Sequence, residues 1–190
     1  MHDARQDRRV ARTGRLLKEA LISLILEKGY EAVSVRDITA RANVGRSTFY
    51  AHFPSKERLL LAGLDDLHAL MAAERGDPAD GAARSGFAFS LPLLRHMHGH
   101  RRLYHAMVGR QGGTIVQLKM RRMLTAIVRQ ELKARAAAGA RDAAFSEATA
   151  QYMVGAFFGR VTWWLDHAAG LSPEEIDGLF NRLAFDGIRA

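Results

Sequence analysis

Polar side chains with the chemistry to recognise DNA are concentrated between Ser34 and Arg58. Phe49 and Phe53 are four residues apart, so a short helix would bury both on one face and leave its polar residues exposed. The polar residues in question are Arg46, Ser47, Thr48, Tyr50 and His52. Side chains of these types form hydrogen bonds with base edges and phosphates, which fits a helix that lies in the major groove.

The residues just before this segment predict another short helix and a tight turn. Ser34 and Asp37 have the spacing of a capping box, which marks the start of a helix. Asn43 tolerates the left-handed conformation that ends many helices, and Gly45 lets the chain turn into the next one. Two short helices joined in this way form a helix-turn-helix.

Two runs of residues in this region match a known signature. Residues 48–60 fit the pattern T-x-Y-x-H-F-x-x-K-E-x-L-L, and residues 29–38 fit G-[YF]-x-x-x-S/T-[VI]-x-x-I. On these residues the chain resembles the TetR/AcrR family of one-component transcriptional repressors, strongly over residues 10–60. So many agreements at fixed spacing make the resemblance specific. The chain departs from the family at Asn43 and Gly45, where Gly and then Ser are more common, and the missing Ser weakens a helix cap.

The resemblance implies a role for each residue of the polar set. Arg46 and Ser47 would face base edges, and Arg36, at the start of the preceding helix, would reach a base or a phosphate. Phosphate contacts would be made by Thr48, Tyr50, His52 and Lys56. The positive end of its own helix would assist Lys56.

Composition limits the classes of protein that remain. A chain of 190 residues is longer than a typical single domain, so one small and one larger domain fit. The net charge is +8, and residues 1–60 hold 12 Lys and Arg against 7 Asp and Glu, as a polyanion partner would favour. The absence of Cys excludes disulfides, thiolate catalysis and cysteine-ligated zinc. No signal peptide or membrane-spanning run is apparent, so we expect a cytoplasmic protein without a membrane partner.

Helical periodicity runs through nearly the whole chain, which predicts an all-α fold of about nine helices. One helix is predicted from about Val10 to Lys28, with Leu17, Leu21 and Leu24 on one face and Gly29 at its end. Another is predicted from Ala83 to Met97 with a kink or break at Pro92, and the capping-box spacing of Ser172 and Glu175 predicts the start of the last helix. Residues 76–81 are rich in helix breakers and indicate a loop. We expect a three-helix helix-turn-helix domain at residues 1–55 and a larger helical effector-binding and dimerisation domain at residues 56–190. A basic arm lies at the N-terminus: Arg5, Arg8, Arg9 and Arg12. The arm would reach a minor groove or phosphates, or it would be a frayed terminus.

A stripe of small and aromatic residues near the C-terminus suggests self-association. The candidate interface residues are Tyr152, Gly155, Gly159, Trp163, Leu179 and Leu183. Small residues allow another helix to approach closely, and a Trp can serve as an anchor. The alternative is that the stripe packs within one subunit. A helix-turn-helix usually reads paired half-sites, and the resemblance implies dimerisation through the last two helices, so we expect a homodimer on palindromic DNA.

The middle of the chain is rich in Met and aromatic residues. Such residues more often form ordinary core, but the resemblance implies a larger domain that houses a small-molecule effector. The candidate pocket residues are Phe87, Met97, Tyr104, Met107, Arg121, Tyr152 and Phe157. Tyr104 and Arg121 would supply the polar contacts. The sequence does not identify the effector.

Metal binding and catalysis find little support. His96 and His100 lie one helical turn apart, but no third ligand is evident, so we predict a solvated corner rich in His and no metal. No nucleophile elbow, metalloprotease motif, phosphate-binding glycine loop or dinucleotide fingerprint is present. We expect neither a cofactor nor enzymatic activity.

Together these features predict a sequence-specific, ligand-responsive DNA-binding regulator. The resemblance implies a repressor that an effector releases from its operator. The alternative is a ligand-independent architectural or protein-recruiting factor with the same fold.

Overall fold

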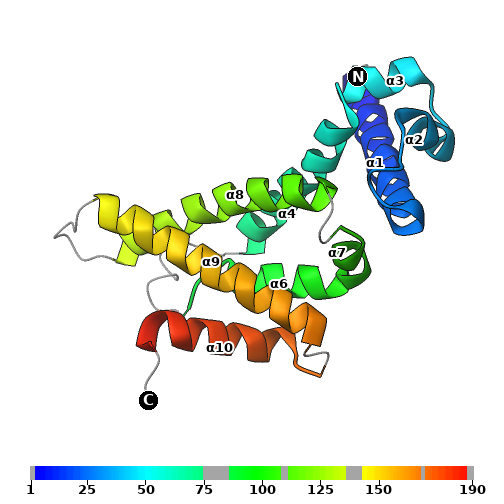
Figure 1. The fold of residues 1–190 in the computed structure, drawn as a ribbon. Coiled ribbons are helices and arrows are strands. Elements are labelled where there is room, and N and C mark those ends of the chain that lie inside the picture. The colour runs from blue at the N-terminus through cyan, green and yellow to red at the C-terminus, as the bar shows by residue number, and fades with distance from the viewer. Residues whose placement is uncertain (1–2, 75–85, 108–110, 136–142, 168–169, 188–190) are drawn as a thin grey trace. The chain divides into compact units, whose positions relative to one another are not determined.

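The computed structural model describes residues 3–74, 86–107, 111–135, 143–167 and 170–187. These residues form nine helices and no strand, which confirms the predicted all-α fold (Figure 1). The helices are α1 (Asp3–Lys28), α2 (Val35–Ala42), α3 (Arg46–His52), α4 (Lys56–Glu74), α6 (Ser90–Gly99), α7 (Arg101–Met107), α8 (Gln111–Arg135), α9 (Ala143–His167) and α10 (Pro173–Asp186). No helix among the described residues is long and apolar enough to cross a membrane. The loop predicted at residues 76–81 lies outside the described residues.

The chain divides into two compact units. The first comprises Met1–Leu67 and Arg102–Leu118, and the second comprises His68–Arg101 and Lys119–Ala190. Helices α4 and α8 therefore each contribute to both units. The boundary predicted between residues 55 and 56 does not coincide with the limits of these compact units, and it stays a prediction of where the functions divide.

The core of the first unit forms around one face of α1. Leu17, Leu21 and Leu24 are buried there at helical spacing, as predicted. Phe49 of α3 and Met107 of α7 pack into the same core. Further buried members come from the loop and from helices α2 and α4: Tyr30, Val33, Ile38 and Leu59. Burial of these apolar side chains fixes α2 and α3 against α1.

Helix α1 begins at Asp3, well before the predicted start near Val10. The basic arm is therefore part of α1 and not a frayed terminus. Residues 3–12 contain no Gly or Pro but four Arg, two Ala and one Gln, which are favourable in helices. Gly29 follows the helix with a φ of 78°, in the helix-ending position that the sequence predicts.

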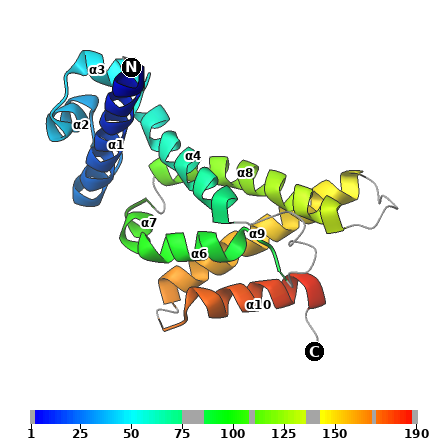
Figure 2. The same cartoon turned by 180° about the vertical axis from the view of Figure 1, so that it is seen from behind.

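In the second unit α10 packs along α6 and also contacts α9 (Figure 2). Aromatic rings fill the space, with ring centroids of Phe87 and Phe180 5.9 Å apart and those of Phe157 and Phe180 5.2 Å apart. Asn181 accepts a hydrogen bond from the backbone N–H of Phe87 at 2.8 Å and donates one to Ser90 at 3.3 Å. These bonds satisfy buried polar groups and fix the start of α6 on α10.

The start of α10 agrees with the sequence prediction, whereas the start of α6 differs from it. The capping box of Ser172 and Glu175 at the start of α10 is present as predicted. Helix α6 was predicted from residue 83 with a kink at Pro92, but it begins at Ser90. Pro92 then lies in the first turn, where its missing N–H breaks no helical hydrogen bond, so no kink is needed.

Candidate nucleic-acid interface

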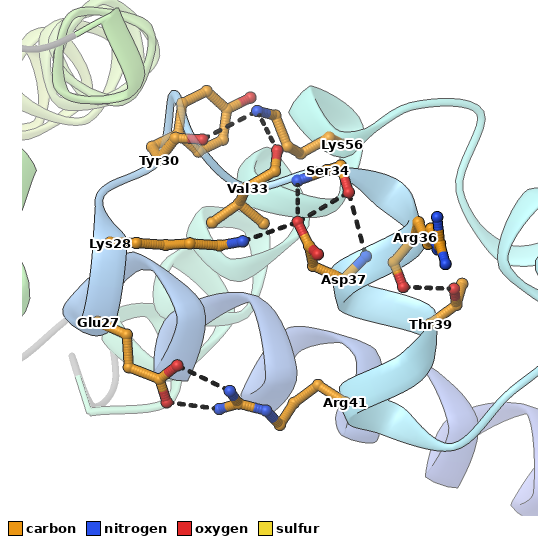
Figure 3. A network of polar contacts seen from close by, with 10 residues as sticks. All are labelled: Glu27, Lys28, Tyr30, Val33, Ser34, Arg36, Asp37, Thr39, Arg41 and Lys56. Atoms are coloured by element: carbon orange, nitrogen blue, oxygen red, sulfur yellow. Dashed lines mark hydrogen bonds and ion pairs between the residues drawn. The ribbon is translucent and has the colours of Figure 1, made fainter.

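The start of α2 is fixed by the predicted capping box. The Ser34 hydroxyl accepts a hydrogen bond from the Asp37 N–H at 3.2 Å, and the Asp37 carboxylate accepts one from the Ser34 N–H at 2.9 Å. Lys28, at the end of α1, donates to the same carboxylate at 2.9 Å (Figure 3). The Lys28 ammonium, together with Ser34, holds the pKa of Asp37 well below its usual range. The cap therefore also joins α2 to α1.

The other end of α2 is also tied to α1. Arg41 forms a bidentate ion pair with Glu27, with both N–O distances 2.7 Å, and donates to the Ser23 hydroxyl at 2.6 Å. This hydrogen-bonded pairing lowers the pKa of Glu27. The fork of Arg matches a carboxylate in one plane, so the pair adds orientation as well as attraction.

Lys56 holds the loop between α1 and α2 on the start of α4. Its ammonium donates to the carbonyl oxygens of Tyr30 at 2.9 Å and Val33 at 2.7 Å, and it lies 4.2 Å from the centre of the Tyr30 ring (Figure 3). Burial lowers the pKa of Lys56. Two of its three N–H groups are therefore used inside the protein. The phosphate contact stays a prediction.

Helix α3 presents a polar face on an apolar anchor. Phe49 is fully buried, and its ring contacts Phe53 at 6.4 Å between centroids. On the opposite side Arg46 and Ser47 are exposed, and 46% of Tyr50 is exposed. The Arg46 guanidinium lies 5.6 Å from the centre of the Tyr50 ring, which supports its orientation. Arg36, on α2, is also exposed, whereas Thr48 and His52 are half-buried.

Thr48 and His52 line a hollow between α3 and the N-terminal part of α1. Its walls are formed by Arg9, Val10 and Thr13 of α1 and by Ser47, Thr48, Ala51 and His52 of α3. Helical spacing does not show which helices meet, so the contact between these two segments is visible only in the structure.

Gly45 offers a test of how α3 is capped. It is the N-cap residue, its φ is −72°, and it provides no side-chain hydrogen bond. A Cβ at this position would lie 3.7 Å from the Ser47 hydroxyl, an ordinary contact. We expect Gly45→Ser to raise the free energy of unfolding by a few tenths to about 1 kcal/mol in urea titrations, because the new hydroxyl can accept from a first-turn N–H. Gly45→Ala is the control, and an equal gain from Ala would contradict the capping explanation.

Comparison with known proteins identifies the family. A sequence profile described as "Bacterial regulatory proteins, tetR family" matches residues 17–62. A profile described as "Transcriptional regulator C-terminal region" matches residues 87–186, more than half of the chain. The chain belongs to the TetR family. The resemblance inferred from the signature residues is thereby confirmed.

Individual TetR-family proteins are similar over different lengths. The HTH-type transcriptional regulator YxbF of Bacillus subtilis is 44% identical over 55 residues, which cover 28% of this chain and 14% of YxbF. The regulator YhgD of the same organism is 25% identical over 194 residues, covering 93% and 96% of the two chains. A TetR transcriptional regulator from Streptococcus agalactiae has the same fold, with 23% identity and a TM-score of 0.68 over 96% of this chain and 98% of that one. The chain spans a third or less of the length of several curated relatives.

Four of the six candidate interface residues line one groove between α9 and α10. They are Tyr152, Gly159, Trp163 and Leu183. Tyr152 is 70% exposed and Trp163 is 47% exposed, so both present apolar surface. Gly155 and Leu179 lie on the same two helices but outside the lining. The neighbouring Trp164 is buried and donates to the Leu171 carbonyl at 2.9 Å.

The seven candidate pocket residues are distributed over both units. Tyr104 and Met107 belong to the first unit, where Met107 is part of the core and burial raises the pKa of the Tyr104 phenol. In the second unit Phe87, Met97 and Phe157 are buried, Tyr152 is exposed in the α9–α10 groove, and the Arg121 guanidinium lies 4.9 Å from the Phe158 ring centre. Of the seven residues, Tyr152 alone lines either the α9–α10 groove or the hollow between α1 and α3.

The corner rich in His forms the end of α6. The rings of His96 and His100 stack with centroids 4.2 Å apart, and His98 stacks on Trp164 at 5.4 Å. In the described part of the chain, no three His, Asp or Glu side chains are grouped so that they could hold a metal ion. The prediction that no metal binds stays a prediction.

His96 should make stability depend on pH. Burial, with a contribution from His100, lowers its pKa from 6.5 to about 4. Between these values the unfolded chain binds a proton that the folded chain does not, so stability should fall as the pH drops through this window. We expect melting temperature to fall less between pH 7 and 4.5 in His96→Gln than in the wild type. His68→Gln, at an exposed position of α4, should retain the wild-type dependence; identical profiles for wild type and His96→Gln would contradict the assignment.

Proposed function

We propose that this TetR-family protein is a sequence-specific DNA-binding regulator that binds a palindromic operator as a homodimer and represses transcription until a small-molecule effector releases it. The observation that carries the proposal is the exposed face of α3, where Arg46, Ser47 and Tyr50 project from a helix anchored by Phe49. Arg36 would add a contact from α2, and Thr48, His52 and Lys56 would contact phosphates. Regulation, rather than catalysis, is the proposed activity.

Selection of DNA fragments by the purified protein tests DNA reading directly. We expect enrichment of an inverted repeat whose half-sites lie one helical turn apart, because paired recognition helices enter successive major grooves on one side of the duplex. Enrichment of a single half-site would contradict the dimeric mode. No enriched sequence at all would contradict sequence-specific reading.

The groove between α9 and α10 supports the proposed homodimer. It has a volume of about 770 Å³ and is lined by exposed apolar side chains, which a second copy of the chain would cover. The remaining candidates, Gly155 and Leu179, would lie at its border. The alternative, in which both stripes pack within one subunit, would leave this apolar surface in water.

Gly159→Leu should disrupt such a dimer. Gly159 is exposed, no atom lies within 4 Å of a Cβ placed on it, and it lines the groove, so Leu would occupy space that the partner needs. Overpacking typically costs about 1–3 kcal/mol, and sedimentation at low micromolar concentration should then show monomer. Gly63→Leu makes the same change at an exposed glycine of α4 with equally open surroundings and should stay dimeric. A dimeric Gly159→Leu variant would move the interface away from this groove.

The proposed effector role of residues 56–190 rests on family membership, and the effector stays unidentified. A ligand at 100 times its dissociation constant should stabilise the folded protein by about 2.7 kcal/mol, visible as a higher melting temperature. It should also release operator DNA, because coupling between two binding sites is reciprocal. Screening apolar metabolites and aromatic acids for both effects tests the switch.

A ligand-independent DNA-binding factor is the second candidate. It is favoured by the close packing of two buried pocket candidates, since the rings of Phe87 and Phe157 lie 5.9 Å and 5.2 Å from the Phe180 ring between centroids. Ligands that raise the melting temperature without changing DNA affinity would support this candidate over the effector-released repressor.

A further inference from the structure

The first turns of α1 carry a stripe of positive charge, formed by Arg8, Arg9 and Arg12 and called the basic stripe below. All three side chains are exposed. Successive residues of a helix are rotated by about 100°, so these three fall within roughly 100° of one another around α1. Asp7 lies on the other side of the helix by the same geometry. Charge is therefore separated around α1, with the positive side extending over slightly more than one turn.

Two members of the stripe have no charged or hydrogen-bonding partner among the described residues. The guanidinium groups of Arg9 and Arg12 form no ion pair or hydrogen bond with any described residue. The next basic residues of α1 differ, because Arg15 pairs with Glu19 at 3.1 Å and Lys18 pairs with Asp66. The pattern of pairing thus leaves the N-terminal end of the helix positive and the following turn neutral.

The basic stripe borders the polar face of α3. Arg9 lines the same hollow as Ser47, Thr48 and His52. A Cβ on Gly14 would lie 4.0 Å from Nδ1 of His52, so α1 and α3 are close at this point. A duplex that contacts α3 would therefore bring its nearest strand beside the first turns of α1.

The spacing of the stripe suits a phosphate backbone. Arg8 and Arg12 are separated by roughly 6 Å along the helix axis, at about 1.5 Å per residue. One strand of DNA carries a phosphate about every 3.4 Å along its axis, so neighbouring side chains of the stripe can reach successive phosphates of one strand. Arg also binds phosphate bidentately, which suits an exposed and unpaired guanidinium.

We propose that the basic stripe binds the DNA phosphate backbone beside the half-site contacted by α3, and that it extends the footprint of each subunit without reading bases. The inference rests on the proposed DNA-binding function and adds to it a second contact region. The stripe lies in α1 ahead of Leu17, the first residue that the family profile matches. Its partner is the polyanion itself and not a particular sequence.

The double variant Arg9→Ala/Arg12→Ala tests the proposal. Binding would be titrated between 50 and 200 mM salt on the selected operator and on a random-sequence duplex of equal length. Each phosphate contact contributes about 0.9 to the slope of log K against log salt, so the slope should fall by about 1.8 per bound subunit on both duplexes. The variant and the wild type are taken to bind equally at 1 M salt, where phosphate contacts contribute little. Over the tenfold drop to 0.1 M salt, the difference in slope then makes the variant bind about 60-fold more weakly per subunit. The melting temperature should not change, because both side chains are exposed and unpaired.

Two controls separate charge from other effects. Arg9→Lys/Arg12→Lys keeps both charges and should retain most of the slope. Arg122→Ala removes one charge from an exposed position of α8 and should leave the slope unchanged. A wild-type slope in the double Ala variant would overturn the proposal, and an altered consensus in DNA selected by that variant would overturn the assignment to phosphates. Equal affinity of the wild type for operator and random duplex would instead contradict the proposed sequence-specific function, while the slope on the random duplex would still test the stripe.

Discussion

Replacing Arg46 with alanine is expected to cause the largest loss of operator binding. The side chain is exposed at the start of α3 and lies over the Tyr50 ring, so it is oriented outward before DNA binds. A bidentate contact from Arg to a base contributes about 1–3 kcal/mol of discrimination, and a dimer on a palindrome would lose it twice. Affinity should therefore fall steeply on the operator, while binding to unrelated DNA changes little.

The measurement is a set of titrations on the selected operator and on derivatives with single base-pair changes. Arg46→Ala should bind equally to the operator and to derivatives changed at one or two positions per half-site, because the contact that distinguished them is gone. Arg122→Ala, on α8, is the charge-matched control and should behave as the wild type. Uniform weakening on every sequence would show that Arg46 contacts phosphate and would contradict its role in reading bases.

Lys56 is a poorer probe of phosphate binding than its position in the signature suggests. Its ammonium donates to the carbonyl oxygens of Tyr30 and Val33, so Lys56→Ala would remove the donor of both hydrogen bonds. The Tyr30 carbonyl would keep its hydrogen bond from the Val33 N–H at 3.2 Å, whereas the Val33 carbonyl would lose the bond from Lys56. An acceptor left unsatisfied typically costs about 1–3 kcal/mol, which would lower stability together with DNA affinity. The phosphate contact is therefore better tested by the salt dependence of binding, at a temperature where the variant is folded.

Gly113→Ala should destabilise the protein, whereas Gly63→Ala should stabilise it. A Cβ at position 113 would lie 2.0 Å from the Met107 carbonyl oxygen, a backbone atom that cannot rotate away. Relief of such a clash by backbone shifts typically costs about 1–3 kcal/mol. Gly63 is also helical, but nothing lies within 4 Å of a Cβ placed on it, so Ala should gain up to about 1 kcal/mol of helix propensity.

Urea unfolding of the two variants measures this contrast. Because the chemical change is identical, any effect on the unfolded chain is shared, and the opposite signs would come from the folded surroundings. Gains of stability in both variants would contradict the close approach of α7 and α8 in this structure.

Sequence reasoning succeeded where the determining interactions are local. The capping boxes at Ser34 and Ser172 join residues three apart, and both are present. Asn43 has a φ of 52°, the left-handed conformation that its residue type predicts at a helix end. Burial of Phe49 followed from its helical spacing with Phe53. Each of these features depends on a few neighbouring residues, which a single sequence contains.

Interactions between distant elements could not be predicted. Arg41 pairs with Glu27 across two helices, and spacing along the chain gives no sign of which carboxylate it meets. Met107 and Tyr104 were assigned to an effector pocket because Met and aromatic residues suit both cavities and cores, yet they belong to the first compact unit. Composition cannot distinguish these environments, because the same apolar side chains fill both.

The first compact unit is discontinuous along the chain, and this has a consequence for how such proteins can be recombined. Met107 of α7 is buried in the core built on α1, and the N–H of Gly112 donates to Glu31 at 3.3 Å. A gene fragment that stops near residue 67 would encode the recognition helix but not residues 102–118, which complete the core of the first unit. Chimeras that transfer operator preference between regulators should therefore exchange residues 1–67 and 102–118 together. A single crossover would combine residues 1–67 of one parent with residues 102–118 of the other in the same core.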